Sequence, residues 1–239
     1  MNLVIDIGNT KVKLALFNNN SIEYQTTLGL QDLENEIDKI EFRKGILCSV
    51  LDNIIIDKIL EKNSEILKLS EKTSIPIKNN YKTKKTLGLD RLANVIGANS
   101  ISKNINCLVI DIGTCLKFDF KNKNNEYLGG SISPGLEMRF KALNAFTNKL
   151  PLIENIENPE LIGVNTNNSI MSGVINGMKS EIIQMINEYR DKYDKISIYL
   201  TGGDLEVFKS IAKQQKNSIF ALNYLTLQGL NTILEHNAK

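Results

Sequence analysis

Val4-Ile-Asp-Ile-Gly8 and Val109-Ile-Asp-Ile-Gly113 are two copies of one pentapeptide in this chain. Each copy ends a short apolar run with an acid and a glycine, and polar residues follow: Asn9-Thr10 in the first copy and Thr114-Cys115 in the second. An alternating apolar run comes next each time, so the sequence predicts a strand, a tight turn and a second strand. One such turn is common and usually structural. Two copies of the turn, each preceded by the same apolar residues, indicate that the chain has two related halves.

The residues of these turns suit a nucleotide. Glycine lets main-chain N–H groups approach a ligand closely, and Asn9, Thr10 and Thr114 add neutral hydrogen bonds to oxygens. A carboxylate such as Asp6 or Asp111 repels bare phosphate, so its expected role is to hold a cation that bridges to phosphate. Two such hairpins facing each other would form a nucleotide clamp.

The length and the repeat indicate the domain organisation. A chain of 239 residues is long enough for one large domain or two small ones. The repeat favours two domains, 1–105 and 106–239, with the boundary in the polar stretch Lys103-Asn-Ile-Asn106.

The order of the expected elements indicates the fold class. Strands are expected at 3–7, 11–17, 22–27, 46–50, 107–112, 115–120, 126–132, 196–201 and 218–221. Helices are expected at 30–40, 53–68, 89–101, 135–147, 168–191, 204–214 and 225–236. Strands interleaved with helices, with a hairpin opening each half, predict an α/β protein with mixed sheets rather than one doubly wound sheet.

Composition and charge exclude several classes of function. The net charge is +2 and the positive residues are scattered lysines, which is not the clustered footprint of a nucleic-acid-binding protein. The chain begins with an expected core strand and has no apolar run long enough to span a bilayer, so we expect a soluble cytoplasmic protein without a membrane partner. Its 3 cysteines show no metal or redox spacing, and its single histidine, His236, lies near the C-terminus. We therefore expect catalysis by carboxylates, amides, hydroxyls, lysines and arginines.

Four further segments carry polar groups at expected helix starts or strand ends. Gly88-Leu-Asp-Arg91 opens a helix and puts Asp90 in the first turn, where the helix dipole favours the ionised carboxylate. The other three segments are Gly129-Gly-Ser-Ile-Ser-Pro-Gly135, Asn165-Thr166 and Thr201-Gly-Gly-Asp204. Each also has an ordinary structural explanation as a cap or a loop, and the residues alone leave both explanations open.

Together these segments resemble, in order and spacing, the type III pantothenate kinases, from residue 3 to about residue 230. The matching motifs are Asp6-Ile-Gly-Asn-Thr-Lys-Val-Lys13, Gly88-Leu-Asp-Arg91, Asp111-Ile-Gly-Thr114, Gly129-Gly-Ser-Ile-Ser-Pro-Gly135, Thr147-Asn-Lys-Leu-Pro151, Gly163-Val-Asn-Thr166 and Thr201-Gly-Gly203. The first motif is shared across a wider superfamily of actin, sugar kinases and heat-shock ATPases. Gly-x-Asp-Arg followed by Asp-x-Gly-Thr is far more diagnostic.

The resemblance implies a fold and an activity. The fold would be α/β, with two ribonuclease-H-like domains of the actin-like ATPase type, mixed sheets flanked by helices, and a nucleotide cleft between them. The activity would be the phosphorylation of pantothenate by ATP to 4′-phosphopantothenate, the first step of coenzyme A biosynthesis. The cofactors would be ATP, Mg²⁺ and a monovalent cation, either K⁺ or NH₄⁺. The resemblance also implies a homodimer in which pantothenate lies near the subunit interface.

The resemblance also assigns roles to single residues. Asp90 would be the general base that takes the proton from the pantothenate hydroxyl, Asp111 would hold the monovalent cation, and Asp6 would help to place magnesium. The residues expected at ATP are Asp6, Ile7, Gly8, Asn9, Thr10, Lys11, Val12, Lys13 and Thr114, with Gly202 and Gly203 near the adenosine. The residues expected at pantothenate are Tyr81, Gly88, Leu89, Asp90, Arg91 and Thr166.

One residue departs from the family pattern. Many members have Ala-x-Thr-x-Asp after the second Asp-x-Gly-Thr, whereas this chain has Cys115-Leu-Lys-Phe-Asp119. Lys117 therefore replaces a threonine. The lysine either adds charge near the phosphates or points into solvent, and it bears on whether a monovalent cation is required.

Three other functions stay open at this stage. The chain could be another small-molecule kinase of the same superfamily, which phosphorylates a sugar or an acid. It could be a nucleotide-binding regulatory protein without turnover, although such a protein has no evident need of Asp90 and Arg91. The repeat argues against the third alternative, a purely structural α/β domain.

Overall fold

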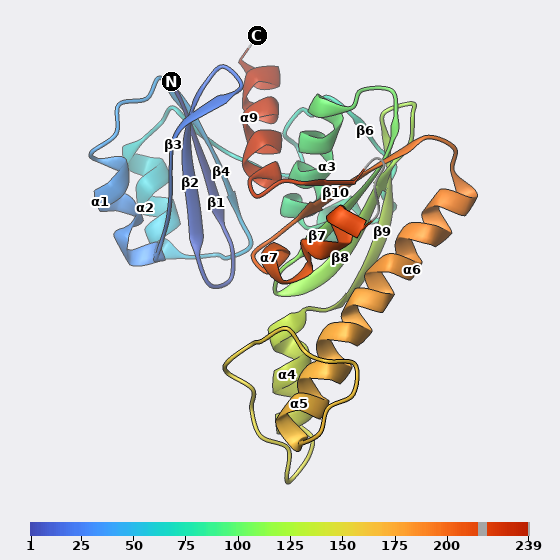
Figure 1. Cartoon of the computed structure of the whole chain (residues 1–239). Helices are drawn as coiled ribbons and strands as arrows, with labels where there is room; N and C mark the ends of the chain where they lie inside the picture. Colours follow the sequence, from blue (N-terminus) through green and yellow to red (C-terminus); the bar gives the residue numbers. More distant parts are fainter. Residues whose placement is uncertain (215–218, 239) are drawn as a thin grey trace. The chain divides into compact units, whose positions relative to one another are not determined.

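The computed structural model describes residues 1–214 and 219–238, and it divides them into two compact units. Unit 1 contains Met1–Asn104, Lys121–Leu128 and Tyr224–Lys239, and unit 2 contains Ile105–Phe120 and Gly129–Asn223. The last helix therefore belongs to the unit that is formed by the first hundred residues. Figure 1 shows the elements of both units.

Unit 1 is built on a five-stranded mixed sheet of order β3-β2-β1-β4-β5. Its strands are β1 (Asn2–Ile7), β2 (Val12–Asn18), β3 (Ser21–Leu28), β4 (Lys44–Ser49) and β5 (Ile66–Lys68). β1, β2 and β3 are joined as antiparallel hairpins, while β4 and β5 run parallel to β1. The central position of β1 explains its nearly continuous apolar sequence, because side chains on both of its faces are buried.

Helices cover this sheet. A 3₁₀ turn (Leu30–Asp32) leads into α1 (Leu33–Ile37), and α1 and α2 (Ile54–Lys62) bury Leu33, Ile37, Ile56 and Ile59 in one cluster with the sheet. α9 (Leu225–Asn237) packs against β1 and against α3 (Leu89–Ile101). Glycines make that helix contact possible, since a Cβ on Gly229 would lie only 1.8 Å from the Ala93 carbonyl oxygen. Unit 1 also contains β6 (Lys78–Asn79), a second 3₁₀ turn (Lys84–Thr86) and the pairing of β6 with Glu126 and Tyr127.

Unit 2 repeats the strand order of unit 1. Its strands belong to a six-stranded sheet of order β11-β10-β7-β8-β9-β6. Apart from the two-residue edge strand β6, the strand with the second pentapeptide is central, as β1 is in the first sheet. The strands are β7 (Asn106–Ile112), β8 (Cys115–Lys121), β9 (Glu126–Pro134), β10 (Ile196–Thr201) and β11 (Ile219–Ala221). β10 pairs in parallel with both β7 and β11. The mixed α/β fold that was expected from the repeat is confirmed.

One helical region of unit 2 extends beyond the sheet along α6 (Figure 1). The chain runs from α5 (Thr166–Met171) through a π-helical turn (Ser172–Asn176) into α6 (Gly177–Lys192), and α4 (Leu136–Ala145) packs against the π-helical turn. We call α4, residues 146–165, α5 and the π-helical turn the distal arm. Shorter helices α7 (Leu205–Phe208) and α8 (Ser210–Gln214) follow β10.

The structure corrects some expected elements. The helix predicted at 53–68 ends at Lys62, and β5 takes residues that were assigned to it. The helix predicted at 30–40 is a 3₁₀ turn followed by the five-residue α1. Of the strand predicted at 218–221, residue 218 lies outside the described residues. The prediction at 89–101 matches α3.

Candidate nucleotide and acceptor site

The first Asp-x-Gly turn joins β1 to β2 in unit 1. The register places Asp6 opposite Lys13, and the Gly8 N–H donates to the Lys11 carbonyl oxygen at 3.1 Å, which closes the turn. Asn9, Thr10 and Lys11 are exposed, so their polar groups are available to a ligand. Of the other residues expected at ATP, Ile7 and Val12 have buried side chains and can contribute only main-chain groups.

The segment Gly88–Arg91 begins α3, also in unit 1. Gly88 is the N-cap residue and Asp90 lies in the first turn. A Cβ on Gly88 would lie 2.5 Å from Oδ1 of Asp90, so the Asp90 carboxylate lies over the glycine. The lack of a side chain at Gly88 thus leaves room for the carboxylate beside the helix N-terminus, where a negative charge is favoured.

Arg91 and Tyr81 meet next to this helix start. The guanidinium carbon of Arg91 lies 5.8 Å from the centre of the Tyr81 ring, which is a cation–π distance. The ring of Tyr81 stacks on the buried ring of Tyr127, with the centroids 6.0 Å apart. The main-chain N–H of Tyr81 donates to Oδ1 of Asn79 at 3.0 Å. Arg91 is 5% exposed. The predicted acceptor residues Tyr81, Gly88, Asp90 and Arg91 are therefore brought together, although they come from two segments.

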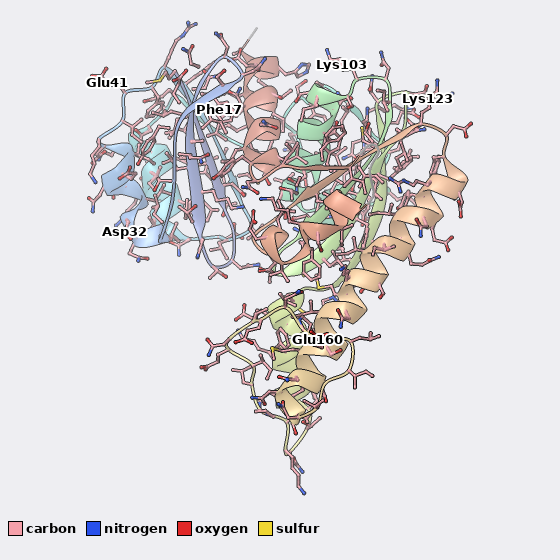
Figure 2. The ribbon with its side chains drawn as sticks, in the orientation of Figure 1. Phe17, Asp32, Glu41, Lys103, Lys123 and Glu160 are labelled. Carbon is pink, nitrogen blue, oxygen red and sulfur yellow. The ribbon has the colours of Figure 1, made fainter. Side chains whose placement is uncertain are left out.

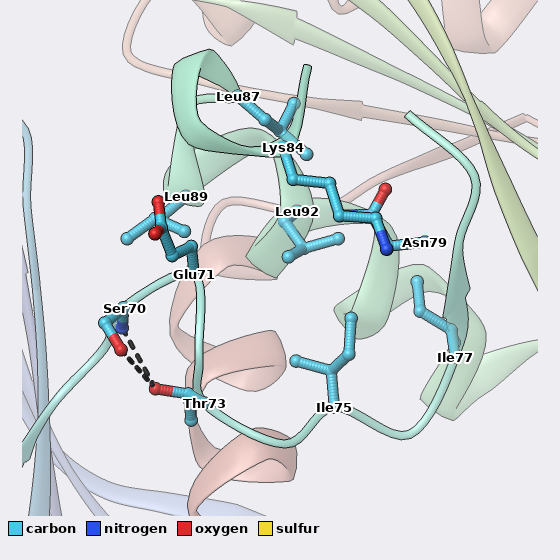
Figure 3. A pocket seen from close by; sticks show the side chains of 10 residues that line it. All are labelled: Ser70, Glu71, Thr73, Ile75, Ile77, Asn79, Lys84, Leu87, Leu89 and Leu92. Atoms are coloured by element: carbon cyan, nitrogen blue, oxygen red, sulfur yellow. Dashed lines mark hydrogen bonds between the residues drawn. The ribbon is translucent and has the colours of Figure 1, made fainter. Parts of the chain in front are cut away.

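A pocket of about 190 Å³ lies behind this group in unit 1. Leucine and isoleucine side chains provide much of its lining, with Leu87, Leu89 and Leu92 from the start of α3, as Figure 3 shows. Of the predicted acceptor residues, Leu89 lines it, whereas Asp90 and Tyr81 do not. This pocket therefore lies beside the start of α3 and contains Leu89 of the predicted acceptor residues.

The second Asp-x-Gly turn joins β7 to β8 in unit 2, and glycines pack against its backbone. A Cβ on Gly135 would lie 2.0 Å from the Gly113 carbonyl oxygen, and one on Gly202 would lie 2.3 Å from the Ile112 carbonyl oxygen. Gly202 also has φ +109°, which an L side chain disfavours. These contacts bring the loop before α4 and the end of β10 to the same turn. Thr114 in the turn is exposed.

Asp111, at the end of β7, is paired with a lysine. The ammonium nitrogen of Lys117 lies 2.8 Å from Oδ2 of Asp111, and each side chain is 15% exposed. Leu116 and Phe118, the neighbours of Lys117 on β8, are buried in the core, so Lys117 projects from the opposite face of the strand. Of the two orientations that the sequence allowed for Lys117, the structure shows the one toward the turn.

Asp204, directly after Gly202-Gly203, faces the same carboxylate. Burial raises the pKa of Asp204, and the nearby carboxylates of Glu137 and Asp111 raise it further. The Asp204 N–H donates to the Ile112 carbonyl oxygen at 2.9 Å, which fixes Asp204 beside β7. Three acids and Lys117 thus determine the electrostatics of the second turn.

The raised pKa predicts a pH-dependent cost in stability. A carboxyl whose pKa is raised by folding stabilises the folded state most below its ordinary pKa. This stabilisation is lost as the pH rises through the pKa that the group has in the folded protein. We therefore expect Asp204→Asn to be more stable than the wild type at pH 7 and the difference to shrink at about pH 4. Urea unfolding at both pH values measures the difference in the free energy of unfolding. Asp191→Asn, at the exposed end of α6, is the control and should show no such difference. An Asp204→Asn variant no more stable than the wild type at pH 7 would contradict the assignment.

Two predicted contacts lie elsewhere in unit 2. Nothing lies within 4 Å of the place where a Cβ on Gly203 would stand, so a flat group has room to approach that backbone. Thr166 is the first residue of α5 and lines a polar pocket of the distal arm. Among the described residues that line this pocket, Thr166 alone was expected to contact pantothenate.

Comparison with known proteins identifies the family. Residues 2–188 match the model of the type III pantothenate kinases. This chain belongs to the type III pantothenate kinase family. A relative of that name from Christiangramia forsetii is 43% identical over 244 residues, which cover 99% of each chain. Another from Phocaeicola vulgatus is 40% identical, with 100% of both chains covered.

Solved structures agree on the fold at much lower sequence identity. A Baf family protein from Campylobacter jejuni has a TM-score of 0.64 at 20% identity, with 99% of this chain and 98% of that chain covered. A glucokinase from an Antarctic psychrotroph has a TM-score of 0.55 at 14% identity, with 98% of each chain covered. These likenesses show that this chain shares its fold with a Baf family protein and a glucokinase.

Two residues of the site were not predicted: Tyr127, which has no signal in the sequence, and Asp204, whose position in the sequence is a signal. Tyr127 supports Tyr81 from a distant strand, and neither spacing nor motif points to it. Asp204 follows Gly-Gly at a strand end, which is a signal, but sequence reasoning gave it no role.

Across residues 1–214 and 219–238, no three His, Cys, Asp or Glu side chains gather so that they could hold a metal ion. In the same residues no helix combines the length and apolar character needed to cross a membrane.

Proposed function

We propose that this protein transfers the γ-phosphoryl group of ATP to pantothenate, giving 4′-phosphopantothenate, the first step of coenzyme A biosynthesis. The observation that carries the proposal is the full-length match to the type III pantothenate kinases. The grouping of Tyr81, Gly88, Asp90 and Arg91 supports it, because it provides an acid and a cation next to one helix start.

Asp90 is the general base in this proposal. Phosphoryl transfer asks a protein mainly to align the reactants and to neutralise charge. The Asp90 carboxylate accepts the proton of the pantothenate hydroxyl as that oxygen attacks the γ-phosphorus. Arg91 and Tyr81 orient the acceptor, Arg91 by binding the pantothenate carboxylate through charge-assisted hydrogen bonds. Gly88 and Leu89 in unit 1 and Thr166 in unit 2 are the other proposed contacts of pantothenate.

The turn from Asp6 to Lys13 binds the triphosphate. The exposed Asn9, Thr10 and Lys11 and the main-chain N–H groups at Gly8 supply donors, and Lys13 opposite Asp6 supplies charge. Thr114 contacts ATP from the second turn, and the open space at Gly203 receives the adenosine.

Magnesium suits the first turn. Mg²⁺ keeps several waters and binds proteins through one or two carboxylates together with substrate phosphates, so a single partly exposed carboxylate such as Asp6 is a suitable ligand. When bound, the ion would neutralise charge that develops on the phosphates. The second turn is different. The family resemblance implies a monovalent cation at Asp111, but a lysine ammonium already pairs with that carboxylate, so these residues do not fit the ion.

The distal arm supports the proposal of a homodimer. Four apolar side chains of the arm are largely exposed: Phe146 (88%), Val164 (86%), Leu161 (80%) and Ile162 (77%). Figure 2 shows the side chains of this region, where Glu160 is labelled. Large exposed apolar side chains, three of them within four consecutive residues, are typical of a protein–protein interface. A dimer through the arm places Thr166 next to the second copy, in keeping with pantothenate near the subunit interface.

Replacing one of these side chains by a charge is expected to separate the dimer. Burial of one large apolar side chain contributes about 1.5–3 kcal/mol, and a symmetric interface buries it twice, so Phe146→Asp should weaken dimerisation by about 100-fold or more. Light scattering after size exclusion measures the mass. Ile54→Asp, at an exposed position on α2 (70%), is the control and should leave the mass unchanged. A wild-type monomer at micromolar concentration would contradict the dimer.

Two further assignments stay proposals. The halves 1–105 and 106–239 are proposed as ribonuclease-H-like domains, which the common strand order of the two sheets supports, while residues 121–128 and the last helix pack with the first half. The protein is proposed to act in the cytoplasm.

An acceptor panel tests the function. Purified protein with ATP labelled in the γ-phosphate and MgCl₂ is offered pantothenate, several hexoses and acetate. We expect label to move to pantothenate only. Transfer to a sugar or to acetate would favour another kinase of the superfamily, and no transfer with intact nucleotide binding would favour the regulatory protein.

A further inference from the structure

The ion pair of Asp111 and Lys117 is partly buried. The two charged atoms are 2.8 Å apart and each side chain is 15% exposed, so water screens the pair less than it screens a surface pair. A further acid, Asp204, is near enough to Asp111 to matter, because the Asp111 carboxylate raises the pKa of Asp204. Lys117 thus places a positive charge on Asp111 at the second turn, where Asp204 adds a second carboxylate.

We propose that the Lys117 ammonium takes the place of the monovalent cation at Asp111, so that this kinase does not require K⁺ or NH₄⁺. The proposal rests on the proposed function. An ammonium group carries the same charge as either ion, and its three N–H donors direct hydrogen bonds at carboxylate oxygens. Because it is tethered to β8, it is present at every concentration of salt, whereas a free ion must be bound from solution at a cost in translational entropy.

The position of the lysine agrees with this role. It stands where many family members have a threonine, so in this chain a cationic side chain replaces a neutral one beside the same carboxylate. The first turn has a related arrangement, since the strand register sets Asp6 opposite Lys13. A K⁺ ion at Asp111 would have to displace Lys117 or share a small space with a like charge, and both cost free energy.

The wild-type protein gives the first test and needs no variant. Turnover of pantothenate is measured with the Tris salt of ATP and MgCl₂, in KCl or in choline chloride at the same ionic strength. We expect the two rates to agree within about two-fold. A rate that rises about ten-fold or more with KCl would overturn the proposal while leaving the pantothenate kinase function intact.

Lys117→Thr restores the family residue and should create a need for the ion. Without the ammonium, Asp111 keeps Asp204 as an acidic neighbour and has lost its cation, so we expect turnover to fall about ten-fold or more in choline chloride and to be recovered by KCl or NH₄Cl. Lys39→Thr is the matched control, because Lys39 pairs with Glu36 on the surface of unit 1 and its loss should create no dependence on KCl.

Thermal unfolding provides a readout that does not depend on activity. KCl in place of choline chloride should raise the Tm of Lys117→Thr by about 2 °C or more and leave that of the wild type unchanged. A wild type stabilised by KCl over choline chloride, or a Lys117→Thr protein with no response to KCl in either Tm or turnover, would overturn the proposal. If no pantothenate is phosphorylated in any salt, the proposed function fails, and these Tm values alone decide whether Lys117 replaces the ion.

Discussion

Asp90→Asn is expected to lower the turnover of pantothenate by about 10²–10⁴-fold, the usual contribution of a positioned general base. The amide fits the same space but cannot accept the hydroxyl proton. Because ATP binds through other residues in this account, the affinity for ATP should stay within about two-fold of the wild type. Steady-state kinetics with both substrates varied, together with ATP binding by calorimetry, measure the two effects.

The matched control is Asp57→Asn. Asp57 also lies in the first turn of a helix of unit 1, and its carboxylate lies on the surface, 3.8 Å from the ammonium nitrogen of Lys68. Its replacement should leave turnover unchanged. If Asp90→Asn retained full turnover, Asp90 would be a helix-start residue of the same ordinary kind, and the acceptor base would have to be sought elsewhere.

Arg91→Ala is expected to raise the KM for pantothenate by about 10–100-fold and to change the KM for ATP by much less. Truncating one partner of a charge-assisted hydrogen bond costs about 1.5–3 kcal/mol, which corresponds to that loss of acceptor binding. The variant also removes the cation that lies over Tyr81. Initial rates with pantothenate varied at saturating ATP, and then the reverse, separate the two constants.

Because Arg91 is buried, its removal also affects the fold, and two further variants separate the causes. Arg91→Lys keeps the charge and should recover part of the lost affinity for pantothenate. Arg43→Ala, at an exposed position in unit 1, should alter neither constant. Equal increases in both KM values for Arg91→Ala would mean that Arg91 serves the fold or the nucleotide rather than the acceptor.

The pentapeptide repeat predicted the two hairpins correctly because the information for a hairpin is local. Strand alternation and a glycine turn define it within about fifteen residues. The repeat also predicted that the halves share an architecture, and the common strand order confirms this. By contrast, the helix expected at 53–68 stops at Asn63, a polar residue that caps α2, and pairing with β4 makes the apolar residues that follow a strand.

The candidate site was predictable where it depends on motifs and not where it depends on side chains that meet in space. Asp90 and Arg91 are in one motif, and the structure adds Tyr81 beside them. No local pattern could place Tyr127 under Tyr81, because the two segments are far apart in the chain. Lys117 could be recognised as a departure from the family, but its long side chain reaches either solvent or the turn, and only packing decides between them.

The most direct measurement of the central claim is a mass balance of one reaction. The purified protein is incubated with ATP, MgCl₂ and pantothenate in choline chloride, and all products are identified by mass spectrometry. The account predicts ADP and a pantothenate derivative heavier by one phosphoryl group, in equal amounts, without added K⁺. ADP and free phosphate with unaltered pantothenate would contradict it.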